Sequence, residues 1–373
     1  MKKILLTAFV AMILIVGCEK DDYQKSQKED SEKDYTPALK VDGRVALAYV
    51  TYYGTATPDP TYFTNINYAF AELYMVNGQY KGFKLQGDES RFRKIVALKT
   101  KYPNLKISLS FINSISNSDN SEGGGFSAMA KSDVYRKAFA ADCKTFLITW
   151  GIDGIDIDWE FPGMTWGTST YDTAVDVSNY TLLMKQLRET LGTTYLLTYA
   201  GYVKDKQATT GGYKYIDVKA VDQYVDFVNI MTYDISEAPK HQSALHNSNA
   251  DWDCERTVNA YLSAGVAANK LVLGIPFYGR HSFSVSPTLI DYKNIILLDK
   301  NIYKIDNWDQ IASVPFVTKS GVYYCGYDNA RSIALKGEWL LGLGMKGLMC
   351  WDYDGDDPAG TLRKALWEAT MKK

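Results

Sequence analysis

The sequence predicts an α/β fold, a (β/α)8 TIM barrel that carries a small α+β insertion between its seventh and eighth strands. Three observations lead to this prediction: eight apolar, β-rich runs recur, helical patterns lie between several of them, and no linker-like break interrupts residues 41–373. Alternating strands and helices indicate a parallel sheet, and eight repeats in about 330 residues are typical of a closed barrel. The runs lie at 45–53, 64–73, 105–112, 152–160, 195–202, 225–234, 271–278 and 346–352.

Helices are expected to alternate with these strands. The clearest begins after Ser178, an expected N-cap, and stops at Gly192, because five apolar residues between them recur at helical spacing. The stretch 283–329 is too long for a simple connection between the last two strands, so it is expected to form the small inserted lobe. Other helices are expected at 90–101, 132–149, 254–264, 330–342 and 360–371.

The composition is that of a folded protein that does not bind nucleic acid. The chain has 41 basic and 43 acidic side chains, a formal net charge of -2 and 46% hydrophobic residues. Binding to a phosphate backbone requires a clustered excess of Lys and Arg, which this balance does not provide. The 28 Tyr, 14 Phe and 8 Trp residues fit either a large core or a surface on which sugar rings stack.

The first 17 residues are predicted to be a lipoprotein signal peptide. Two lysines precede an apolar run at 4–16, which is shorter than the roughly 20 residues that cross a bilayer. Ile15, Gly17 and Cys18 resemble the lipobox of bacterial lipoproteins, in which the cysteine becomes the lipidated N-terminus; plain secretion is the alternative. Residues 18–40 are polar, so we expect a flexible tether that holds the barrel at a bacterial membrane, facing the periplasm or the cell surface.

Neither the cysteines nor the histidines predict a metal site, and no cofactor is expected. The cysteines after residue 18 lack the close pairs of zinc sites, and the histidines lack HExxH-like pairing. Buried free thiols are expected, although one disulfide stays possible because pairing cannot be deduced from sequence. The residues concerned are Cys143, Cys254, Cys325 and Cys350, and His241, His246 and His281.

Three carboxylates follow one face of the fourth expected strand. In the segment DGIDIDWE at 153–160, Asp156, Asp158 and Glu160 alternate with apolar residues, which must face the surrounding helices. The carboxylates therefore point into the barrel or toward its upper rim. Crowded like charges raise at least one pKa, so that a proton is retained, which a general acid needs. A metal site, an ion-pair site or a solvated strand edge is the alternative.

The segment DGIDIDWEFP resembles the DxxDxDxE signature of glycoside hydrolase family 18, the chitinases and chitinase-like endoglycosidases. Four other segments resemble family motifs in the family's order: Asn67–Phe70, Met231–Asp234, Gly274–Arg280 and Trp351. On this resemblance the chain is identified as a member of the family. Its catalytic groups are then expected at the C-terminal ends of the barrel strands.

The resemblance implies retaining, substrate-assisted hydrolysis of β-1,4-linked N-acetylglucosamine glycans. Glu160 would act first as the general acid and later as the base, and no carboxylate of the enzyme would attack the sugar. Asp158 would hold the acetamido group as it becomes a cationic oxazolinium, and Asp156 would poise Asp158. Tyr233 would align the acetamido oxygen for attack.

Substrate-binding residues follow from the same resemblance. Asp153 would support the carboxylates from lower in the strand, and the others would line the subsites or the floor beneath the distorted ring. Core packing is the alternative for the aromatic residues, and a surface ion pair is the alternative for the arginine. The partner implied is an N-acetylglucosamine-containing oligosaccharide or polysaccharide, bound by a monomer. The residues are Asp153, Phe70, Met231, Asp234, Tyr278, Arg280 and Trp351.

The third expected strand departs from the family's pattern. Ser110, Phe111, Ile112 and Asn113 stand where the family usually carries Ser-x-Gly-Gly, so bulk is added beside the cleft. The departure leaves the substrate class open. An endo-β-N-acetylglucosaminidase acting on N-glycans or on peptidoglycan is the main alternative. A chitinase-like lectin is disfavoured, because such members typically lose the acid that Glu160 provides.

Overall fold

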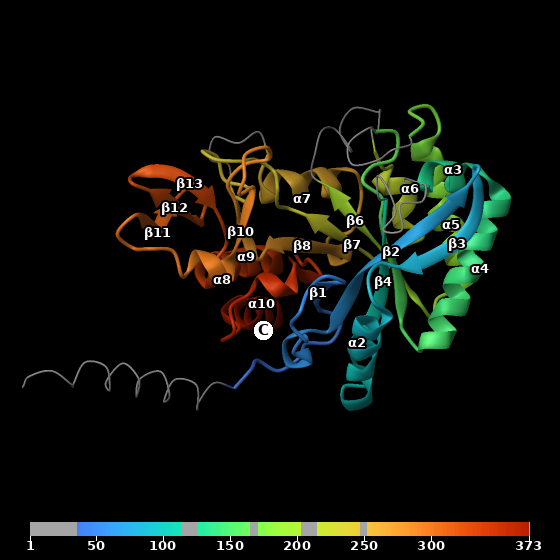
Figure 1. The fold of residues 1–373 in the computed structure, drawn as a ribbon, viewed down its shortest axis with the longest axis horizontal. Coiled ribbons are helices and arrows are strands. Elements are labelled where there is room, and N and C mark those ends of the chain that lie inside the picture. Colours follow the sequence, from blue (N-terminus) through green and yellow to red (C-terminus); the bar gives the residue numbers. More distant parts are fainter. Residues whose placement is uncertain (1–35, 114–124, 165–170, 203–214, 247–251, 373) are drawn as a thin grey trace, which may run out of the picture. The chain divides into compact units, whose positions relative to one another are not determined.

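The computed structural model describes residues 36–113, 125–164, 171–202, 215–246 and 252–372. Residues Ala38–Lys373 form one compact unit (Figure 1). Within the described ranges, no helix combines the length and the apolar content needed to span a bilayer. The predicted signal peptide, most of the predicted tether and Cys18 lie outside the described residues.

Eight parallel strands close into a barrel, which confirms the predicted fold class (Figure 1). The first strand pairs in parallel with both the second and the last, so the sheet has no gap between its ends. The eight are β1 (Val45–Thr51), β2 (Asn65–Val76), β4 (Lys106–Ile112), β5 (Gly154–Asp158), β6 (Leu196–Tyr202), β7 (Phe227–Met231), β8 (Leu271–Pro276) and β14 (Gly347–Trp351). Strand β3 (Gln79–Leu85), which was not predicted, pairs with β2 in antiparallel orientation.

All six predicted helices are present, with short elements added between them. The long helices are α2 (Glu89–Lys101), α4 (Asp133–Trp150), α5 (Asp176–Leu191), α7 (Cys254–Ser263), α9 (Ala330–Gly342) and α10 (Thr361–Met371). The short ones are α3 (Phe126–Lys131), α6 (Val218–Asp222), α8 (Tyr292–Ile295), η1 (Pro60–Tyr62), η2 (Ala268–Lys270) and η3 (Tyr353–Gly355).

The prediction that Ser178 is the N-cap of α5 was wrong, because the helix begins before this residue. The helix begins at Asp176, and the hydroxyl of Ser178 donates to the Val175 carbonyl within its first turn, so Ser178 is not the N-cap. The side chain of Asp176 is buried and accepts hydrogen bonds from the Ser127 hydroxyl at 2.7 Å and the Gly163 amide at 3.1 Å. Asp176 thus fixes the start of α3 and the segment after β5 to the start of α5.

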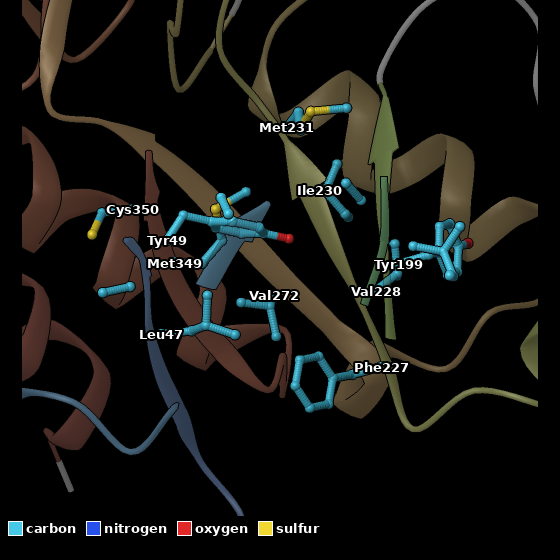
Figure 2. Packing of buried hydrophobic residues seen from close by; sticks show 14 of the residues in the cluster. Leu47, Tyr49, Tyr199, Phe227, Val228, Ile230, Met231, Val272, Met349 and Cys350 are labelled. Carbon is cyan, nitrogen blue, oxygen red and sulfur yellow. The ribbon is translucent and has the colours of Figure 1, made fainter. Parts of the chain in front are cut away.

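The interior of the barrel is packed with side chains from alternate strand positions. Figure 2 shows Leu47, Tyr49, Val272 and Met349 gathered between β1, β8 and β14. All four are buried. The alternate residues of each strand face the helices, as the two-residue period of a strand requires. The four cysteines after residue 18 are buried free thiols, which confirms that expectation; they lie on α4, α7, β13 and β14.

The insertion between β8 and β14 is a lobe built around a five-stranded antiparallel sheet. Its strands are β9 (Tyr278–Arg280), β10 (Leu289–Asp291), β11 (Tyr303–Asp309), β12 (Val314–Lys319) and β13 (Val322–Gly326), in the order β10-β9-β13-β12-β11. The lobe therefore begins at Tyr278 and not at the expected residue 283. The reason is that β9 follows β8 almost directly and already pairs with β10 and β13.

A buried ion pair fastens the lobe to the barrel. The ammonium of Lys336, on α9, is fully buried and lies 2.8 Å from the carboxylate of Asp328, just after β13. It also donates to the carbonyl and the hydroxyl of Ser243, in the segment after β7, at 2.7 and 2.8 Å. A buried charge with this complete a set of partners is tolerated, but the loss of one partner leaves the other uncompensated.

Replacement of Lys336 by Met should therefore lower the free energy of unfolding by roughly 3–5 kcal/mol, since Asp328 would stay buried without its cation. The matched control is Lys372→Met, which breaks the exposed Lys372–Glu338 pair (58% and 56% exposed side chains) and should cost at most about 1 kcal/mol. Urea unfolding followed by tryptophan fluorescence measures both. Equal losses in the two variants would contradict the structural role of Lys336.

Candidate active site

A cavity of about 200 Å³ opens at the C-terminal ends of the barrel strands. It brings together seven of the site residues predicted from sequence, Ile112, whose bulk was expected beside the cleft, and Tyr202, which was not predicted. The lining residues are Phe70, Ile112, Asp158, Glu160, Tyr202, Met231, Tyr233, Asp234 and Trp351. Strand ends converge at this rim because the strands are parallel, which explains how segments so distant in sequence meet.

Asp156 lies directly beneath the cavity and is fully buried. Its two oxygens accept hydrogen bonds from Tyr49 at 2.8 Å, Ser110 at 2.7 Å, Thr198 at 2.6 Å and Asn229 at 3.3 Å. Burial raises the pKa of Asp156, and these hydrogen bonds oppose the rise. Four neutral donors from four different strands thus hold one carboxyl group in a fixed orientation.

Asp158 and Glu160 form a hydrogen-bonded pair of carboxyl groups above Asp156. The pKa of Asp158 is raised well above its ordinary value, first by burial and then by the charges of Glu160 and Asp156. The pKa of Glu160 is raised to about 7, mainly by burial and also by Asp234, while the hydrogen bond to Asp158 lowers it. Two carboxyl groups can share a hydrogen bond only if one is protonated, so the pair retains a proton at neutral pH.

One oxygen of this pair is available for a ligand. Oδ1 of Asp158 is buried and has no hydrogen-bond partner within the described ranges. A buried acceptor without a partner is costly, unless a bound molecule supplies the donor.

Tyr233 places a phenol hydroxyl at the cavity two residues after the end of β7. The ring is buried, and its centroid lies 6.3 Å from that of Tyr278. Burial raises the pKa of Tyr233, and the neighbouring carboxylates of Asp158 and Glu160 raise it further. The hydroxyl therefore keeps its proton and can act as a hydrogen-bond donor to a ligand.

Asp234 is held in place by Arg280, which does not itself line the cavity. Nε and Nη2 of Arg280 lie 2.8 and 2.7 Å from the two carboxylate oxygens, a bidentate ion pair. Arg280 is buried, so the alternative of a surface ion pair is wrong. The Tyr202 hydroxyl donates to the Asp234 carbonyl at 2.9 Å and thereby supports the same turn. No sequence motif indicated Tyr202, whose part depends on a contact with a segment 32 residues away.

Aromatic rings form one wall of the cavity. The ring of Trp351 stacks on Phe70 with centroids 5.6 Å apart and an interplanar angle of 26°. Trp351 also lies 5.5 Å from Tyr49, whose hydroxyl binds Asp156. Trp351 is only partly buried, so it presents apolar surface to the cavity as well as to the core. A flat apolar surface of this kind suits the face of a sugar ring.

A second cavity of about 330 Å³ adjoins the first, and Trp351 lines both. Tyr278, predicted as a binding residue, lines this second cavity together with Tyr53, Asp291 and Asp352. The pKa of Asp352 is raised to about 6, mainly by burial and also by the charges of Asp354 and Asp291. Two spaces that share Trp351 in their lining can hold neighbouring units of a chain-like ligand.

The structure places Asp153 away from both cavities, which corrects its prediction as a substrate-binding residue that supports the carboxylates from lower in the strand. Asp153 lies just before β5, at the opposite end of the barrel, where its carboxylate forms ion pairs with Lys99 and Lys106. It also accepts a hydrogen bond from the Ile107 amide at 2.9 Å. Asp153 therefore fixes β5 to β4 and α2, and it does not belong to the row of carboxylates that continues through Glu160.

The two residues that replace the family's glycines lie beside the acidic pair. Ile112 is the register partner of Asp158 and contributes its side chain to the cavity wall. Asn113 is buried, and neither its amide nitrogen nor its amide oxygen has a partner in the part of the chain that the structure describes. The serine of the same segment, Ser110, does contact the inner Asp156. Among the described residues, no cluster of three or more His, Cys, Asp or Glu side chains is arranged to hold a metal ion.

Comparisons with known proteins agree with this geometry. The model of the family "Glycosyl hydrolases family 18" matches residues 45–356. Chitinase A1 of Niallia circulans is 27% identical over 83% of this chain and 55% of its own length, so this chain spans about half of that relative. A class V chitinase of Lotus japonicus is 28% identical over 84% of this chain and 82% of its own.

Solved structures show the same fold. A glycoside hydrolase family 18 N-acetylglucosaminidase from Paenibacillus barengoltzii superimposes with a TM-score of 0.72 at 25% identity, over 87% of this chain and 99% of that one. The multi-modular, cell-surface-expressed chitinase ChiW from Paenibacillus gives a TM-score of 0.73 at 26% identity, over 88% of this chain and 43% of that chain.

The raised pKa of Glu160 predicts how folding stability depends on pH. The unfolded chain releases this proton near pH 4.3, whereas the folded chain keeps it until about pH 7, so stability falls as pH rises through this window. Between pH 4 and pH 8, the wild type should therefore lose about 3 kcal/mol relative to Glu160→Gln, which has no proton to release. Urea unfolding at intervals of pH measures the difference. The control, Glu338→Gln on the exposed face of α9, should follow the wild-type curve, and a parallel curve for Glu160→Gln would contradict the assignment.

Proposed function

Because the chain belongs to glycosyl hydrolase family 18, a family of chitinase-like hydrolases, we propose that it cleaves β-1,4-linked N-acetylglucosamine glycans with Glu160 as acid and base. The observation that carries the proposal is the Asp158–Glu160 pair, which retains a proton at the edge of a cavity walled by Trp351. The related chitinases and the related N-acetylglucosaminidase support this class of substrate.

In the first step, Glu160 donates its proton to the glycosidic oxygen. A group with a pKa of about 7 is mostly protonated just below neutral pH, yet releases its proton readily to a developing alkoxide. The acetamido oxygen of the substrate then attacks the anomeric carbon and the bond to the leaving sugar breaks, as in the substrate-assisted glycosidases. The product of this step is a cyclic oxazolinium that carries positive charge.

Asp158 and Tyr233 orient the acetamido group for that attack. The unpartnered Oδ1 of Asp158 is placed to accept the acetamido N–H, and the protonated hydroxyl of Tyr233 donates to the acetamido oxygen. Once Glu160 has donated the proton that the two carboxyl groups share, Asp158 is ionised, and its negative charge stabilises the positive charge of the oxazolinium. Two contacts to one small group restrict it to the attack geometry, which accounts for much of such rate enhancements.

In the second step, Glu160 accepts a proton from the water that opens the oxazolinium. Attack on the face that the leaving group vacated restores the original anomeric configuration, which makes the reaction retaining. Asp156 does not touch the substrate in this scheme. Its four hydrogen-bond donors hold it beneath Asp158, where its charge controls how strongly Asp158 keeps a proton.

Product analysis tests the substrate class. The chain is incubated with chitin oligosaccharides and, in parallel, with a high-mannose glycoprotein, and the products are identified by mass spectrometry. We expect short N-acetylglucosamine oligomers from the first substrate. Release of glycan from the glycoprotein alone, by a cut between its two core N-acetylglucosamine units, would establish the endo-β-N-acetylglucosaminidase instead. If neither is cut, peptidoglycan fragments are the next substrate, and sugar binding without turnover would favour the lectin.

The endo-β-N-acetylglucosaminidase remains the second candidate because of Ile112 and Asn113. Ile112 narrows the cavity next to Asp158, at a position where the chitinase pattern has no side chain. A substrate that approaches the acidic pair from a different direction is compatible with that wall. Peptidoglycan contains the same amino sugar and falls under the same alternative.

Replacement of Glu160 by Gln should lower kcat by about 100- to 10,000-fold and leave substrate binding nearly unchanged, because the amide keeps the shape but cannot transfer a proton. Asp153→Asn is the matched control, since Asp153 belongs to the same segment but lies at the other end of the barrel. It should keep its turnover and lose stability only. Wild-type kcat should fall as pH rises above about 7, when Glu160 ionises. Unchanged turnover in Glu160→Gln would refute the role of Glu160.

We further propose that Cys18 is lipidated and that residues 18–40 tether the barrel to a bacterial membrane. The support is the sequence of residues 1–18. Mass spectrometry of the N-terminal peptide from membranes of an expressing bacterium should show a diacylglycerol on Cys18. Cys18→Ser should move the protein from the membrane pellet to the supernatant. An unmodified Cys18 at the mature N-terminus would show plain secretion.

A further inference from the structure

The two ends of the barrel carry opposite charge, although the whole chain is nearly neutral. Parallel strands all start at one end, here called the base, and all finish at the other, where the acidic cavities lie. Counted from the last four residues of each preceding helix to the first residue of each strand, the segments that lead into the eight strands hold nine basic and five acidic residues. They are Lys40, Arg44, Lys99, Lys101, Lys106, Arg188, Lys219, Lys270 and Lys346, against Asp42, Asp153, Glu189, Asp222 and Asp226.

The opposite end is strongly acidic. The described segments directly after β5, β7, β8 and β14 hold seven acidic residues against two basic ones. The acidic residues are Glu160, Asp234, Glu237, Asp352, Asp354, Asp356 and Asp357, and the basic ones are Lys240 and Arg280. The formal net charge of -2 therefore conceals a separation of charge along the barrel axis.

Two lysines at the base are exposed and stand beside a cavity. Lys40 and Lys101 line a hollow of about 280 Å³ together with Tyr102 and Trp367. Neither lysine has a carboxylate partner among the described residues, in contrast to Lys99 and the other paired cations of the base. Leu39, next to Lys40, is 75% exposed, so apolar surface and cationic groups occur together here.

The chain enters the barrel at this same place. The amide of Ala38 donates to Glu368 at 2.9 Å, and Nε1 of Trp367 donates to the carbonyl of Ala38 at 2.8 Å. Both partners lie on α10, near the C-terminus marked in Figure 1. Ala38 is therefore fixed to α10 beside the hollow that Trp367, Lys40 and Lys101 line.

We propose that the base docks on an anionic phospholipid surface, so that the acidic cavities face away from the membrane. Lysines near such a surface are attracted by its negative potential, and each contributes roughly fivefold to the partition coefficient. Lys40 and Lys101 lie over phosphate groups in this arrangement, while the exposed Leu39 and the rings beside the hollow meet the interface. The negative charge of the membrane repels the acidic end of the barrel, so the barrel binds with its base toward the membrane.

Vesicle sedimentation tests the proposal with the chain from residue 36 onward, whose barrel closes and packs its core as one compact unit. We expect binding to vesicles of phosphatidylglycerol and phosphatidylcholine, little binding to phosphatidylcholine alone, and release as salt is raised from about 0.05 to about 0.5 M. Lys40→Glu with Lys101→Glu should lower the partition coefficient at least tenfold. Hydrolysis of a small substrate and the thermal midpoint should stay unchanged, since neither lysine lies near the cavities with Glu160 and Asp352.

The matched control has the same net charge but reverses two exposed lysines of the lobe, Lys300→Glu with Lys304→Glu. It should bind vesicles almost as well as the wild type. Equal losses in the two double variants would show that only net charge matters and would overturn the proposal. So would an absence of binding to anionic vesicles. Residues 19–35 carry a net charge of -3, and if a peptide of this sequence binds the base while vesicles do not, the base is a site for the chain's own acidic segment.

Discussion

The withdrawal of a row of carboxyl groups from water is the constraint on which the rest of the site depends. The two-residue period of β5 brings Asp156 and Asp158 to one face, where the closed barrel buries them, and Glu160 follows two residues after the strand and is partly buried. Burial of acids is unfavourable unless protons are retained or donors are supplied. The barrel does both: it surrounds Asp156 with donors and leaves the upper pair to share a proton.

Those donors explain why the whole barrel, rather than one strand, makes the site. Tyr49, Ser110, Thr198 and Asn229 come from β1, β4, β6 and β7, so any shift of register between these strands would remove a hydrogen bond from Asp156. These four residues therefore have two functions: they pack the barrel interior, and they donate hydrogen bonds to Asp156. A residue that fills the barrel interior here also sets the protonation of the group above it.

Periodic and local features could be predicted from the sequence, whereas features made by contacts across the chain could not. The β5 carboxylates were predicted because alternation within a strand is visible in the sequence. The role of Asp153 was predicted wrongly, because the partners that hold it at the other end of the barrel, Lys99 and Lys106, come from other segments. Tyr202 was missed for the same reason, since it acts through the Asp234 carbonyl. The predicted N-cap of α5 was wrong as well. Ser178 has the residue type of an N-cap, but the helix begins at Asp176, whose partner Ser127 comes from a distant segment.

The buried ammonium of Lys336 has a consequence for how such a lobe can be exchanged between barrels. Its partner Asp328 lies at the end of the insertion, and its partner Ser243 lies in the connection after β7. Three separate segments of the chain, including α9 with Lys336, therefore form the contact between lobe and barrel. If the lobe were transferred alone into another barrel, it would bring the carboxylate of Asp328 but not the ammonium of Lys336 or the hydroxyl of Ser243. A recombination that keeps this contact must transfer α9 and the segment after β7 together with the lobe. We therefore expect insertions in this position to vary in sequence at their outer hairpins more than where they join the barrel.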